Sequence, residues 1–123
     1  MHPFRYVVSL RIWHPQIDAS VVSDTLGLGS KRTSPAVPFF WTHAYDTHGN
    51  ECAAFIHSVA SALRQHAAFF QRVRASGGRS EFFVGWFGDR NVGDTFSHAT
   101  LSLLAELEIG LSFDVYPGGP QVT

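Results

Sequence analysis

The stretch "SHATLSLLAELEIGLSFDVY" (residues 97–116) places a helix and a strand in direct succession and so sets the architecture of the chain. Ser97 is positioned as the N-cap of a helix that ends near the "EIG" of 108–110. Residues 111–116 then alternate apolar and polar side chains, which is the period of a half-buried β-strand. The segment "SEFFVGWF" (80–87) before the helix also has the composition of a strand. The C-terminal part is therefore predicted to be a strand–helix–strand unit.

The N-terminal part follows the same plan. "FRYVVSLRIW" (4–13) alternates in the manner of a strand, and "IDASVVSDTLGLG" (17–29) reads as a short helix. Asp18 is its expected N-cap, and Gly27 is placed to end it. "FFWTHAY" (39–45) is the next predicted strand. The chain thus contains a weak internal repeat, in pattern more than in residue identity.

A longer helical segment separates the two units. Apolar side chains recur at helical spacing from 52 to 75, which predicts one central helix, whereas 29–38 and 88–96 have the composition of loops. These elements predict an α+β fold: a single mixed sheet of about four strands in two strand–helix–strand units, with helices on one face. A ferredoxin-like sheet is the first candidate for the strand arrangement, and the added central helix is the main departure from that plan.

Composition and length limit the classes of protein that this chain can form. The 123 residues are a typical length for one domain, spanning 1–123. A net charge of -1 and a charged fraction of 15% argue against nucleic acid and anionic membranes as partners. The single cysteine excludes an internal disulfide and a multi-cysteine zinc site. No signal-peptide pattern or long apolar run is seen, so a cytoplasmic location is expected, and no cofactor is implied.

Alternation divides each predicted strand into two faces of different chemistry. One face is apolar and suits a helix layer; it contains Leu10, Ile12, Phe82, Val84, Leu111, Phe113 and Val115. The opposite face combines charged and aromatic side chains, namely Arg11, Trp13, Glu81, Phe83, Asp114 and Tyr116. Such a mixture is typical of interaction surfaces, although a second small core under a covering loop or helix is an equal alternative. In a ferredoxin-like sheet the first and last strands are neighbours, which predicts that Arg11 and Asp114 pair across them.

Four features of the chain carry a family resemblance: "LRIWHP" near the start, "LGL" after the first helix, Trp41, and "SLLAELEIGLSFDVY" at 102–116. With them the chain resembles the bacterial family of unknown function numbered forty-two seventy-nine. The resemblance covers nearly the whole chain, and its most specific part is the C-terminal segment. It implies a small stand-alone α+β protein without established activity, and it supplies no catalytic residues to transfer.

The stretch "FFWTHAYDTHGNEC" (39–52) gathers side chains that metal sites and nucleophilic enzymes use. They are His43, Asp46, His48, Glu51 and Cys52. In an extended strand, residues 43 and 48 point to opposite faces, and no pair has the spacing of a known ligand motif. The expectation is a solvated turn without bound metal, in which His43, Asp46 and His48 are the weak metal candidates. A metal-dependent or thiol enzyme built around His43, Asp46, His48 and Cys52 is the alternative function.

The leading functional hypothesis is a non-catalytic protein-binding module that uses the charged and aromatic sheet face. An immunity-type protein that blocks a partner toxin is one example, self-association is a second form of partner, and a plain structural subunit is a third class. "RSEFFVGWF" (79–87) is similar to the aromatic strand of RNA-recognition sheets. However, Glu81 and Phe82 occupy the positions of an aromatic and a small residue, and the chain lacks a basic footprint. A protein partner is therefore favoured over nucleic acid.

Overall fold

A computed structural model describes residues 5–30, 32–34, 39–47, 51–88 and 92–117. Its elements are β1 (Arg5–His14), α1 (Ala19–Leu26), β2 (Arg32–Ser34), β3 (Phe39–Ala44), α2 (Cys52–Leu63), the 3-10 turn η1 (Arg64–His66), α3 (Ala67–Ala75), β4 (Arg79–Gly88), α4 (His98–Leu107) and β5 (Ile109–Pro117). The predicted strand–helix–strand units are confirmed as β1–α1–β3 and β4–α4–β5. The short strand β2 lies in the segment predicted to be a loop, where a three-residue strand leaves no periodic signal.

All five strands form one mixed sheet in the order β2-β3-β1-β4-β5. β1 is central and antiparallel to both β3 and β4, while β2 pairs antiparallel with β3 at one edge. β4 and β5 are parallel neighbours joined through α4. The predicted α+β fold with a single mixed sheet is therefore confirmed.

One neighbour relationship expected from the ferredoxin-like arrangement is wrong. The last strand, β5, lies beside β4 and not beside the first strand, β1. The reason is the crossover through α4, which returns the chain in parallel to the edge of β4, while β1 already has β3 and β4 on its two sides. Residues of β1 and β5 are consequently two strands apart.

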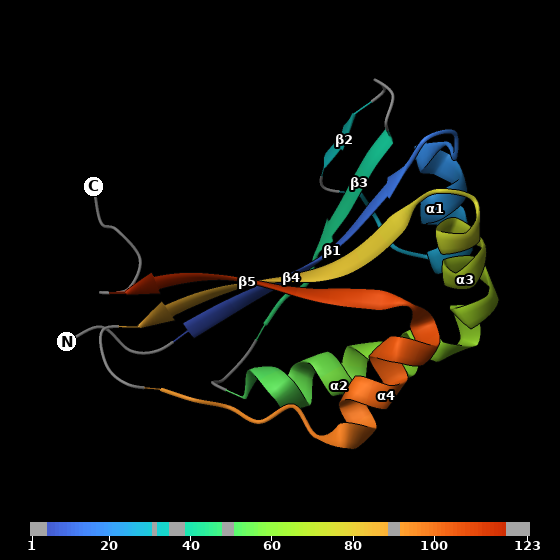
Figure 1. Ribbon diagram of the computed structural model, residues 1–123. Helices are drawn as coiled ribbons and strands as arrows, with labels where there is room; N and C mark the ends of the chain where they lie inside the picture. The colour runs from blue at the N-terminus through green and yellow to red at the C-terminus, as the bar shows by residue number, and fades with distance from the viewer. Residues whose placement is uncertain (1–4, 31, 35–38, 48–50, 89–91, 118–123) are drawn as a thin grey trace.

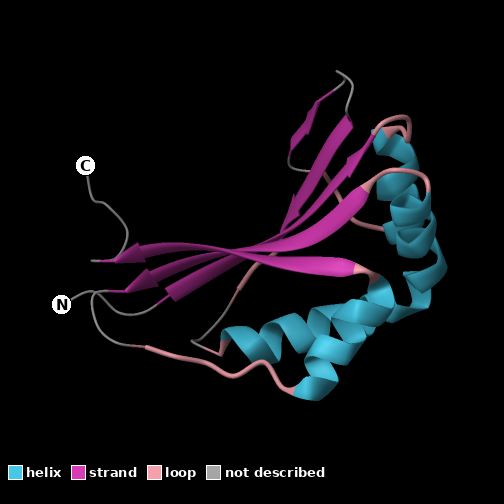
Figure 2. Cartoon of the chain, viewed as in Figure 1, coloured by secondary structure: helices cyan, strands magenta, loops and turns pink. Residues whose placement is uncertain are grey.

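The helices cover one face of the sheet, and no helix of the described residues lies on the other face (Figures 1 and 2). Figure 2 also shows the start of β1 and the ends of β4 and β5 projecting past the helices. Leu10, Ile12, Phe82 and Val84 face the helices and are fully buried, as predicted. Phe113 and Val115 lie on the same side but are 42% and 62% exposed, because β5 extends beyond the helix layer there. Their predicted place in the core is wrong.

The predicted central helix over 52–75 is divided into α2, η1 and α3. No Gly or Pro stands at the break, so the sequence carries no local signal for it. The turn redirects the chain so that α2 packs beside α4 while α3 lies under the other end of the curved sheet (Figure 1). The break in the helix therefore results from packing against a twisted sheet and not from a local change in helix propensity.

Helix ends follow the sequence signals closely. The Asp18 side chain accepts a hydrogen bond from Ser20 N at the start of α1, and Gly27 ends that helix with a φ of 67°. The Ser97 side chain accepts from Thr100 N at the start of α4. α2 is capped from a distance, because Asp94 Oδ2 accepts from Ala53 N over 2.8 Å. Within the described part of the chain, no helix has the length and apolar character needed to cross a membrane.

Candidate interaction face

The side of the sheet without helices is called the open face below. It is formed by Arg5, Val7, Ser9, Arg11 and Trp13 of β1, Phe40, Thr42 and Ala44 of β3, Arg79, Glu81, Phe83, Gly85 and Phe87 of β4, and Gly110, Ser112, Asp114 and Tyr116 of β5. The six residues predicted from alternation to share one face all lie on it. The strands reach this arrangement through the period of two. The intervening residues of β1 are buried, as are Ser80, Phe82 and Val84 of β4.

Three arginines of the open face lie over aromatic rings. The Cζ atom of Arg11 is 3.7 Å from the ring centroid of Phe83, that of Arg79 is 4.1 Å from Trp13, and that of Arg5 is 4.9 Å from Phe87. The register causes these contacts, because Arg5 is paired with Phe87 and Trp13 with Arg79, while Arg11 and Phe83 are diagonal neighbours. These six residues are called the arginine–aromatic row.

Further rings cover the two ends of the row. Trp13 lies between Arg79 on β4 and Phe40 on β3, with 5.2 Å between the Trp13 and Phe40 ring centroids. Phe87 lies between Arg5 on β1 and Tyr116 on β5, whose ring is parallel to it within 7° at 4.7 Å. Neighbouring strands therefore fill both sides of these rings. Trp13 and Phe87 are thus each in contact with side chains from two strands, whereas Tyr116 on the edge strand is 41% exposed.

A glycine makes room for this packing. Gly85 is buried on the open face, and a Cβ there would stand 2.7 Å from Val7 Cγ2 and 3.1 Å from Phe87 Cε2. Real Cβ atoms do not approach that closely, so any side chain at 85 displaces Val7 or Phe87. Gly85 thus supports the position of the Phe87 ring between Arg5 and Tyr116.

The predicted Arg11–Asp114 pair does not form. β4 lies between the strands of the two residues, and the Asp114 carboxylate instead accepts a 2.6 Å hydrogen bond from the Tyr116 hydroxyl. This hydrogen bond is the main reason that the pKa of Tyr116 is raised, while the nearby Arg11 charge acts in the opposite direction. The Arg11 Nε–H is shielded from water and has no acceptor among the described residues. Within the same residues, no ion pair neutralises the arginines of the open face.

The described residues of the alternative enzyme hypothesis are not brought together into a site. His43 lies on the helix side of β3, where its Nδ1 contacts the Gly29 carbonyl oxygen at 2.6 Å, and Asp46 is exposed. Cys52 is fully buried at the start of α2, and burial, with a smaller contribution from Asp94, raises its pKa to about 12. Glu51 is exposed beside it, and His48 lies outside the described residues. In the described ranges, no three His, Cys, Asp or Glu side chains group to hold a metal ion.

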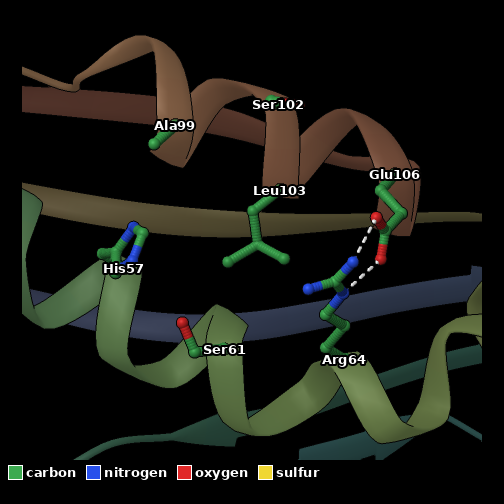
Figure 3. Close-up of a pocket in the computed structure, with 7 residues that line it drawn as sticks. All are labelled: His57, Ser61, Arg64, Ala99, Ser102, Leu103 and Glu106. Carbon is green, nitrogen blue, oxygen red and sulfur yellow. Dashed lines mark hydrogen bonds and ion pairs between the residues drawn. The ribbon is translucent and has the colours of Figure 1, made fainter.

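A groove between α2 and α4 contains a second group of polar side chains (Figure 3). It is lined by His57, Ser61, Arg64, Ala99, Ser102, Leu103 and Glu106. Arg64 and Glu106 close one end with two contacts of 2.7 and 3.2 Å, and Leu103 projects between the helices. His57 Nδ1 is 2.7 Å from the hydroxyl of Thr100, which is buried and also lies 3.2 Å from the Ser97 hydroxyl. The polar groups of this groove therefore join the two helices.

Four charged or aromatic residues of the open face were missing from the predicted set: Arg5, Phe40, Arg79 and Phe87. For three of them the signal is present in the sequence, because Arg5 has the same strand parity as Arg11, and Arg79 and Phe87 the same parity as Glu81. Extending the alternation to the ends of these strands would have found Arg5, Arg79 and Phe87, whereas the side on which Phe40 lies follows from the pairing of β3 with β1.

Comparison of the chain with protein-family models, curated proteins and solved structures gives no significant match.

Proposed function

We propose that this chain is a non-catalytic protein-binding module and that the open face is its binding surface. The observation that carries the proposal is a sheet face without a helix layer on which arginines lie over aromatic rings. Arginine and aromatic residues are enriched in the centres of protein interfaces, where they account for much of the binding free energy. Rings and guanidiniums that already hold one another in place lose little conformational freedom on binding.

A second protein is a better occupant of this face than another copy of the chain. Among the described side chains, the open face carries three arginines and two carboxylates, and Asp114 already bonds Tyr116. A two-fold dimer through the face would bring six of these arginines and four of these carboxylates into one interface, so that arginines are in excess. An immunity-type role, in which the face blocks a partner toxin, is a specific form of this proposal. We also propose a cytoplasmic location and membership of the bacterial family numbered forty-two seventy-nine, which the sequence resembles.

The buried thiol of Cys52 and the dispersed positions of His43 and Asp46 support a non-catalytic function. The test is affinity capture from a lysate of the source organism, followed by binding measurements with the purified partner. Phe83→Ser with Tyr116→Ser changes the open face, whereas Leu101→Ser is a control at a 50% exposed site on α4. We expect one partner to be lost with the face variant and kept with the control. Capture that is equal for both variants contradicts the proposal.

A further inference from the structure

We infer that the partner presents a carboxylate-rich, extended segment, and that the arginines of the row bind its carboxylates. This inference rests on the proposed function and specifies the chemistry of the partner. It is carried by three guanidiniums that are fixed over rings and have no acidic partner among the described residues. A guanidinium that lies over a ring keeps its N–H groups in a planar fork, which matches the two oxygens of a carboxylate.

Arg11 gives the most specific observation. Its Cζ is 3.7 Å from the Phe83 centroid, the shortest of the three contacts, and its Nε–H lacks an acceptor in the described part of the chain. A donor kept from water without an acceptor is unfavourable, particularly on a charged group. A partner carboxylate that binds the guanidinium of Arg11 removes this penalty when the side chain rotates to bring its Nε–H to the ligand. Among the described residues of the free protein this donor therefore has no acceptor, and an acidic ligand supplies one.

The spacing of the arginines favours an extended peptide segment over a small-molecule carboxylate as the ligand. Arg5 and Arg11 lie on one strand and are separated by about 20 Å at about 3.4 Å per residue. Arg79 is paired with Trp13, two residues beyond Arg11, which adds about 7 Å along the strand direction. Acidic residues at alternate positions of an extended segment are also separated by about 7 Å, so one segment can reach Arg11 and Arg79 together.

Carboxylates fit this face better than the phosphates of single-stranded nucleic acid. Proteins that bind single strands supply free ring faces on which bases stack. Here both sides of Trp13 and Phe87 are already filled by neighbouring side chains. The net charge of -1 also gives no general attraction to a phosphate backbone.

The experiment measures binding to defined probes by fluorescence anisotropy. The probe is a labelled peptide of about twelve residues that alternates glutamate with serine, compared with the same peptide containing glutamine. Arg11→Gln/Arg79→Gln removes two charges from the row, and Arg64→Gln/Arg72→Gln removes two exposed charges from the helix side as a matched control. Urea midpoints establish that each variant is folded. If the row variant does not fold, Arg11→Lys/Arg79→Lys replaces it, since lysine keeps the charge but lacks the planar fork.

We expect saturable binding of the glutamate peptide and a dissociation constant at least about tenfold higher for the glutamine peptide and for the row variant. The control variant should remain within about twofold of the wild type, and binding should weaken as salt rises from about 50 to about 500 mM. Equal affinity of the row and control variants, or no binding of the glutamate peptide at millimolar concentration, overturns the inference. Binding of oligothymidylate that is tighter than binding of the glutamate peptide and depends on the row also overturns it. A dimer that light scattering detects for the wild type and not for the row variant does the same.

Failure of this inference can be separated from failure of the proposed function. The row and control variants are also passed through the affinity capture described above. A captured partner that depends on Phe83 and Tyr116 but is indifferent to Arg11 and Arg79 overturns the acidic segment and leaves the binding face intact. A partner that depends on both supports the inference. A capture that no open-face variant affects overturns both.

Discussion

The guanidinium of Arg11 lies over the ring of Phe83, with 3.7 Å between Cζ and the ring centroid, and Asp114 bonds Tyr116 instead of Arg11. Alternation along the strands places all four residues on one face, but the strand order determines which of them meet. Because β4 separates β1 from β5, Arg11 meets residues of β4. Its guanidinium makes no ion pair with Glu81, which is opposite it in the register, and lies over Phe83. Such a contact fixes the arginine without neutralising it, which leaves its charge for a ligand.

A double-mutant cycle should detect this contact. We expect Arg11→Ala and Phe83→Leu to show a coupling free energy of about 0.5–1 kcal/mol in urea denaturation, the range of exposed cation–π contacts. The cycle of Arg11→Ala with Asp114→Ala is the control, and its coupling should be within about 0.3 kcal/mol of zero. Stronger coupling of Arg11 to Asp114 than to Phe83 would contradict the arrangement of the arginine–aromatic row.

Gly78 fixes the junction between α3 and β4. A Cβ at this position would stand 2.5 Å from the Trp13 carbonyl oxygen, 2.7 Å from His14 Cδ2 and 2.9 Å from Val73 Cγ1. Since one of these atoms is backbone, the clash cannot be relieved by a side-chain rotation alone. We expect Gly78→Ala to lower the free energy of unfolding by about 1–3 kcal/mol or more.

The matched control for Gly78→Ala is Gly29→Ala, where nothing lies within 4 Å of the added atom. Its free energy of unfolding should change by less than about 1 kcal/mol. Urea titrations of both variants measure the difference. Similar stabilities for the two variants would show that α3 and β4 do not approach as closely as the structure has them.

His14 makes stability depend on pH. It is buried, its Nδ1 accepts from the N–H groups of Gln16 and Ile17 at 2.9 Å each, and its Nε2 donates to the Ser76 hydroxyl at 2.7 Å. The ring is therefore held neutral, and burial lowers its pKa from the usual value of 6.5. The unfolded chain binds a proton at a higher pH than the folded chain does. This contribution to stability is complete above about pH 6.5 and decreases as the pH falls toward the lowered folded pKa.

The measurement is the urea midpoint of the wild type and of His14→Gln between about pH 8 and about pH 5. The wild type should lose more stability on acidification than the variant, and the difference between the two isolates His14 from the other histidines. The variant is also expected to be less stable at neutral pH, because its side chain cannot reproduce three hydrogen bonds in the same place. Parallel pH profiles would show that His14 is not held in its neutral form.

The period of two and the capping residues made much of this fold predictable from sequence. Leu10 and Ile12, and likewise Phe82 and Val84, are two residues apart on one strand, so that each pair shares a side of the sheet by local geometry. Asp18 and Ser97 cap helices through a bond to a backbone N–H two or three residues away, which is also local. The shared face of Arg11, Glu81 and Asp114 is predictable for the same reason. None of these features requires knowledge of which strands are neighbours.

The parts that could not be predicted depend on contacts between distant segments. The place of β5 beside β4 follows from how α4 packs, and the turn at 64–66 from the curvature of the sheet. Asp94 caps α2 across 41 residues of sequence, so no local pattern identifies it. The position of Arg11 over Phe83 combines strand register with a rotamer choice. The candidate face was therefore predictable as a set of residues, but its internal pairing was not.

The reactivity of the Cys52 thiol distinguishes the proposed binding module from the alternative thiol enzyme. The Cys52 side chain is fully buried and its pKa is raised to about 12, first by burial and then by the Asp94 carboxylate. At neutral pH the fraction of reactive thiolate is therefore very small. We expect the native protein to react with a disulfide reagent at least about a hundredfold more slowly than the urea-unfolded protein, measured by the absorbance of the released thiol. Cys52→Ala should also keep the captured partner, because the thiol lies on the helix side of the sheet. Rapid reaction of the native thiol, together with loss of function in Cys52→Ala, would favour the enzyme over the binding module.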